Sequence, residues 1–163
     1  MGGILWGDKK ETNKIMNEHP YEFSLVKKEF RYEFLSVSPQ KEVQKVVLLT
    51  QTQYSSIYNL ALLDTLENGT LSDISVTGND DLKTVLATVI KIINSFLNEN
   101  PNSFVIFKGS DERRHRLYRI IISRELVEIE KSFKVLAIKN NEIISFSSEN
   151  EMDFYLIGKH ENN

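Results

Sequence analysis

Every arginine in this chain except Arg31 and Arg124 lies in one polar stretch, residues 108–119. The stretch follows an apolar segment at 104–107 and leads into the apolar residues 120–122. This order predicts a strand, a tight polar turn and a helix whose first half is basic. Backbone amides and positive charge at a helix N-terminus favour an anion. The candidate binding residues for an anionic ligand or partner are therefore Lys108, Ser110, Arg114, Arg116 and Tyr118.

Helical phase separates the side chains of this predicted helix. Its apolar stripe consists of Leu117, Tyr118, Ile121 and Ile122. Arg114 lies on the stripe, one turn before Tyr118, and should point toward the protein body. A guanidinium there needs either a carboxylate, such as Asp111 or the acidic turn at 80–81, or a bound ligand. His115, Arg116 and Arg119 lie on the opposite side, where we expect Arg116 and Arg119 to be solvated charges.

Tyr118 is the one candidate for catalysis, as a general acid, and the alternative is a tyrosine of the hydrophobic core. The chain has no cysteine, which excludes disulfides, thiolate nucleophiles and zinc sites with cysteine ligands. Its histidines, at positions 19, 115 and 160, are too scattered to suggest a metal site. No phosphate-binding loop or catalytic triad pattern is visible. We expect no metal and no cofactor.

The composition is that of a water-soluble globular domain with a net charge of -3. The chain as a whole is therefore no polyanion binder, and nucleic acid is a possible but not a favoured partner. No apolar stretch approaches the roughly 20 residues of a membrane span, so we expect no membrane partner. No secretory signal is visible, so the expected location is the cytoplasm.

The pattern along the chain predicts one α+β domain at residues 21–163 after an N-terminal extension at 1–20. Alternating apolar residues and turn signals between 21 and 77 predict an antiparallel meander. The strongest helical periodicity lies at 80–98 and predicts a long amphipathic helix. After the strand at about 103–108 and the basic helix at 111–123, we expect a short helix at 124–131. Strands at 133–138, 142–146 and 153–157 complete a mostly antiparallel sheet, with a hairpin turn at Asn140-Asn141.

This order of elements, from about residue 41 to 157, is similar to the central and C-terminal parts of the GCN5-related acetyltransferase fold. Asp111 and Tyr118 fall where that fold commonly has Asn and Tyr in its second helix. The resemblance implies a divergent acyltransferase with its cleft between the two central strands. The turn that would hold the pyrophosphate of coenzyme A has one glycine, Gly78, and two carboxylates, Asp80 and Asp81. Negative charge at that point disfavours the cofactor.

A closer resemblance links residues 21–157 to a bacterial domain family of unknown function. It rests on the segments Val85-Leu86-Ala87-Thr88-Val89, Phe107-Lys108-Gly109-Ser110 and Arg114-His115-Arg116-Leu117-Tyr118. The resemblance implies a host-defence or toxin–antitoxin setting and brings no activity. We therefore expect a cytoplasmic binding module with a basic strand–loop–helix site, and a divergent acyltransferase is the alternative.

Overall fold

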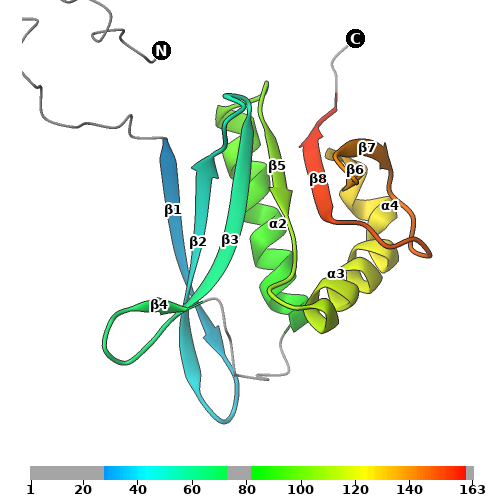
Figure 1. Cartoon of the computed structure of the whole chain (residues 1–163). Coiled ribbons are helices and arrows are strands. Elements are labelled where there is room, and N and C mark those ends of the chain that lie inside the picture. The colour runs from blue at the N-terminus through cyan, green and yellow to red at the C-terminus, as the bar shows by residue number, and fades with distance from the viewer. Residues whose placement is uncertain (1–27, 73–81, 161–163) are drawn as a thin grey trace, which may run out of the picture.

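An eight-stranded, mostly antiparallel sheet forms the centre of the protein in a computed structural model that describes residues 28–72 and 82–160 (Figure 1). With three helices in these residues, the predicted α+β class is confirmed. The strands are β1 (Glu29–Val37), β2 (Glu42–Gln51), β3 (Ile57–Thr65), β4 (Leu71–Ser72), β5 (Phe104–Phe107), β6 (Phe133–Lys139), β7 (Glu142–Ser145) and β8 (Phe154–Lys159). The helices are α2 (Leu82–Glu99), α3 (Glu112–Arg124) and α4 (Leu126–Ile129).

The strand order is β1-β2-β3-β5-β8-β6-β7, and β4 pairs with β3 at the end of that strand. The described strands pair antiparallel except β3 with β5, which are parallel. A parallel pair needs a long crossover connection, and α2 lies in it. Figure 1 shows α2 behind β3 and β5, and α3 running below β8.

The predicted meander is confirmed in β1, β2 and β3, which pair in sequence order. In β1 the aromatic residues Phe30, Tyr32 and Phe34 face the core, and charged residues alternate with them. The predicted turn at Asn140-Asn141 is also confirmed, because both residues have positive φ angles of 52° and 64° and join β6 to β7. Asparagine tolerates this backbone conformation better than most residues, which suits a two-residue hairpin.

The long helix predicted at 80–98 is confirmed from Leu82 onward as α2. Its apolar stripe is buried against the sheet, and Phe96 is fully buried. The Phe96 ring packs edge to face on Phe30 and Tyr58, with centroid distances of 5.1 and 4.9 Å. Aromatic pairs in this geometry add stability beyond their buried area. This cluster ties α2 to the meander.

Some predicted features lie outside the described residues. They are the extension at 1–20, most of the strand expected at 70–77 and the turn at 77–81. Within the described residues, no helix is long and apolar enough to cross a membrane.

Candidate functional site

The predicted strand–turn–helix unit is confirmed as β5, a four-residue turn and α3. Gly109 makes the turn possible, because a Cβ atom at this position would lie 2.2 Å from the backbone nitrogen of His115. Asp111 then caps α3, and its Oδ1 accepts a hydrogen bond from the Arg114 amide at 2.8 Å. The carboxylate therefore already occupies the amide-rich end of α3 where we expected an anion.

The structure brings three of the candidate binding residues together and directs a fourth elsewhere. Arg114 is half-buried and donates from Nη1 to the Ser110 hydroxyl at 3.2 Å. Tyr118 is buried one turn further along. Lys108 is exposed, and its Nζ lies 5.2 Å from the centre of the Phe154 ring on β8. Lys108 is thus engaged in a cation–π contact with the neighbouring strand.

Burial is the main reason why the pKa of Tyr118 is raised above its usual value. The nearby Arg114 charge lowers this pKa, and the carboxylates of Asp111 and Asp64 raise it. The Tyr118 hydroxyl therefore stays protonated well above neutral pH. It can donate a hydrogen bond or a proton but is no base.

His115 lies on the side of α3 opposite the apolar stripe, yet it is enclosed by other parts of the protein. It is half-buried, and its Nδ1 accepts a hydrogen bond from the Gly109 amide at 3.0 Å. Its Nε2 lies 2.7 Å from the Met152 carbonyl oxygen, and its ring packs 4.7 Å from that of Tyr155. The loop between β7 and β8 covers this side of α3, which helical phase alone cannot show.

Arg119 contradicts the prediction that its side chain is a solvated charge. It is half-buried, its Nη1 donates to the Asn150 carbonyl at 3.3 Å, and its Nε is buried. Beneath it, the Tyr155 hydroxyl donates to the His115 carbonyl. Burial raises the pKa of Tyr155 far above its usual value, and the Arg119 charge acts on the same hydroxyl and lowers its pKa. His115 and Arg119 therefore fasten α3 to the β7–β8 loop and to β8.

One buried ion pair was not predicted from the sequence. Lys45 on β2 and Asp64 on β3 lie opposite each other, with Nζ 2.6 Å from Oδ1, and only 7% and 6% of their side chains are exposed. The sequence contains a signal for a buried charge, because Lys45 precedes the core residues Val47 and Leu49 by two and four positions and so faces the same side of the strand. A charge in the inward register of a strand needs a partner. Asp64 provides it and also acts on the Tyr118 hydroxyl.

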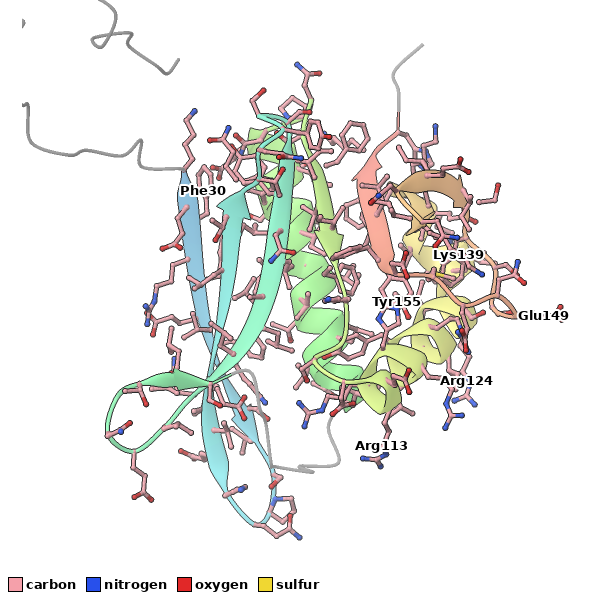
Figure 2. All side chains as sticks on the ribbon, in the orientation of Figure 1. Phe30, Arg113, Arg124, Lys139, Glu149 and Tyr155 are labelled. Atoms are coloured by element: carbon pink, nitrogen blue, oxygen red, sulfur yellow. The ribbon has the colours of Figure 1, made fainter. Side chains whose placement is uncertain are left out.

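The outer surface of α3 carries the exposed arginines. Arg113, Arg116 and Arg124 are exposed, and Figure 2 shows Arg113 and Arg124 pointing away from the sheet. Arg116 is the candidate binding residue that lies on this surface, as its helical phase predicted. Beside it is a depression of about 320 Å³ between α3 and the start of α2. The lining residues are Lys83, Leu117, Ile120, Ile121, Arg124 and Glu125.

Over residues 28–72 and 82–160, no group of three or more His, Asp or Glu side chains is arranged to hold a metal ion. The site is therefore an α3 surface of arginines and apolar side chains on an α+β domain. Residues 17–160 match the family of unknown function DUF6934, and the chain belongs to this family. This confirms the resemblance to a family of unknown function, and membership assigns no activity. No curated protein and no solved structure shows a significant match to the chain.

Proposed function

We propose that this protein is a binding module that holds an anionic partner on the outer surface of α3. The observation that carries the proposal is the set of three exposed arginines, Arg113, Arg116 and Arg124. At 100° per residue they fall within about a quarter of the helix circumference. None of the three takes part in an ion pair with another described residue. A row of cations without an ion-pair partner among the described residues, on a chain of net charge -3, is a local feature that favours an anionic surface.

The inner half of the predicted site supports the fold more than ligand binding. Asp111 fills the N-terminal end of α3, and Lys108 contacts Phe154. Arg114 donates to the Ser110 hydroxyl at the start of α3, and Tyr118 is buried one turn further along, so these residues help to position α3. The centre of the proposed site therefore moves from the strand end to the outer face, and Arg116 belongs to both. The proposal includes the cytoplasmic host-defence or toxin–antitoxin setting that the resemblance to a bacterial family implies.

A charge-reversal comparison tests the proposal. The test variant combines Arg113→Glu, Arg116→Glu and Arg124→Glu. The matched control combines Lys91→Glu, Lys134→Glu and Lys139→Glu, which reverses three exposed cations elsewhere. The probe is a fluorescein-labelled glutamate 20-mer, measured by anisotropy at low and physiological salt. We expect the wild type and the control to bind with similar affinity, and the test variant to lose at least tenfold. Equal losses in both variants would show that only net charge matters and would overturn the proposal.

A divergent acyltransferase is the second candidate, and Tyr118 favours it. Its raised pKa keeps the hydroxyl protonated, as a general acid requires. Tyr118 lies on α3, which follows the parallel strands β3 and β5 in the chain. The order of these strands with α2 and α3 resembles that of the acetyltransferase fold. Calorimetry with acetyl-coenzyme A separates the candidates. We expect no binding below about millimolar concentration, since Asp80 and Asp81 would repel the pyrophosphate. A micromolar dissociation constant would favour the enzyme.

A further inference from the structure

We infer that the anionic partner is an acidic protein segment that also carries apolar side chains, which it places in the depression beside α3. This inference rests on the proposed function and names the class of partner. The floor of the depression consists of Leu117, Ile120 and Ile121, and Ile120 is 36% exposed. Two residues after Glu125, Val127 on α4 is 75% exposed. Exposed apolar side chains gathered beside charged ones are typical of interaction surfaces.

The rim of the depression is basic. Lys83 and Arg124 line it, and Arg113 and Arg116 continue along the same face of α3. Among the described residues, Glu125 is the lining carboxylate, and it is paired with the Lys83 ammonium group at 3.1 Å. The net positive charge of the rim therefore complements a partner with carboxylates. Such complementarity speeds association and excludes basic partners.

The side chains on the floor of the depression favour a protein segment over a nucleic acid as the partner. Single-stranded nucleic acids bind by phosphate contacts and by stacking of bases on aromatic rings. Among the residues that the structure describes, no aromatic side chain lines the depression. Its volume of about 320 Å³ is at the low end for a ligand pocket, which suits one or two large apolar side chains. An acidic segment with leucine or phenylalanine at helical spacing would use both the floor and the rim, as groove-bound helices do.

Three fluorescein-labelled probes test the inference. The first is a 15-residue acidic peptide with leucines at i, i+3 and i+7, the second has serine at those positions, and the third is a 15-nucleotide single strand of DNA. We expect the leucine peptide to bind the wild type at least tenfold more tightly than either other probe. Ile120→Ser should remove this advantage and leave the weaker, salt-dependent binding of the serine peptide. Ile143→Ser, which changes a 63% exposed residue on β7, is the matched control and should change neither.

The outcomes separate the inference from the proposed function. If the serine peptide or the DNA binds as tightly as the leucine peptide, the inference is wrong while the anionic surface stands. If no probe binds, both are wrong. Melting temperatures show whether Ile120→Ser folds, and Val127→Ser serves as a second variant because its side chain is largely exposed. If both serine variants fold and leave the preference for leucine unchanged, the floor is not the docking site.

Discussion

At the scale of single residues, the hydrogen bonds of His115 define its protonation state. One ring nitrogen accepts from an amide N–H, so it carries no proton. The other faces a carbonyl oxygen at 2.7 Å, so it carries one. The imidazole is therefore neutral with the proton on Nε2. It joins the β5–α3 turn to the loop before β8 across the side of the helix opposite the apolar stripe.

Replacing His115 should show how much these two hydrogen bonds contribute to the free energy of unfolding. His115→Phe leaves the Gly109 amide and the Met152 carbonyl without their partner, and each lost buried bond costs about 1–3 kcal/mol. Arg116→Ala, at the next position but exposed, is the control and should change stability by less than about 0.5 kcal/mol. Urea denaturation at pH 7.5 measures both. A loss for His115→Phe as small as that of the control would mean that water replaces the ring at no cost.

At this scale, the sequence could not predict the environment of every side chain on α3. Arg114 and Arg116 behave as helical phase indicated, because phase is a local property. Arg119 does not, because its partner is Asn150, more than thirty residues away in the chain. No periodicity within α3 could reveal that a loop packs over one side of the helix.

At the scale of elements, the sequence was sufficient to predict each helix or hairpin whose own residues form a recognisable pattern. The α2 helix has an uninterrupted apolar stripe, and the β6–β7 hairpin has its Asn-Asn turn. The order of strands in the sheet has no such local signal, since β8 lies between β5 and β6. The pairing of Lys45 with Asp64 depends on the register of β2 against β3, which the alternation pattern leaves open.

Removing one member of the Lys45–Asp64 pair should reduce stability strongly, whereas replacing both members with apolar residues should reduce it little. Lys45→Met leaves the Asp64 carboxylate buried without its counter-ion, and we expect a loss of about 3–5 kcal/mol. The double variant Lys45→Met with Asp64→Leu removes both charges and should recover most of that loss, because apolar replacements of buried pairs are often neutral. Urea unfolding of the two single variants and the double variant gives the coupling energy. If the double variant loses as much as the two single variants together, the pair has no coupling and its register is incidental.

At the scale of the whole molecule, the basic face of α3 stands on a body of net negative charge, and buried tyrosines lie beneath it. Tyr118 and Tyr155 connect the helix to β5 and β8 through ring contacts with Phe107. Burial raises the pKa of both phenols. The packing beneath the proposed binding surface therefore requires both hydroxyls to be protonated.

This requirement predicts a loss of stability in alkaline solution, and its sign follows from linkage. An unfolded tyrosine releases its proton near pH 10, while Tyr155 in the folded protein keeps it. Above about pH 10 the folded state thus binds more protons than the unfolded state, so stability falls as pH rises. The slope approaches about 1.4 kcal/mol per pH unit for each such tyrosine. Below about pH 9 the contribution is fully present.

Comparing tyrosine variants isolates this effect from the titration of lysines, which all variants share. Tyr155→Phe should lower stability at pH 8 by about 1–2 kcal/mol, because the hydrogen bond from the hydroxyl to the His115 carbonyl is lost. It should also make the decline between pH 9.5 and 11 shallower than in the wild type. Tyr54→Phe changes a tyrosine that is 61% exposed and should leave the decline unchanged. Urea unfolding across this pH range measures both. A wild-type decline as shallow as that of Tyr155→Phe would show that the Tyr155 hydroxyl ionises in the folded protein as readily as in the unfolded chain.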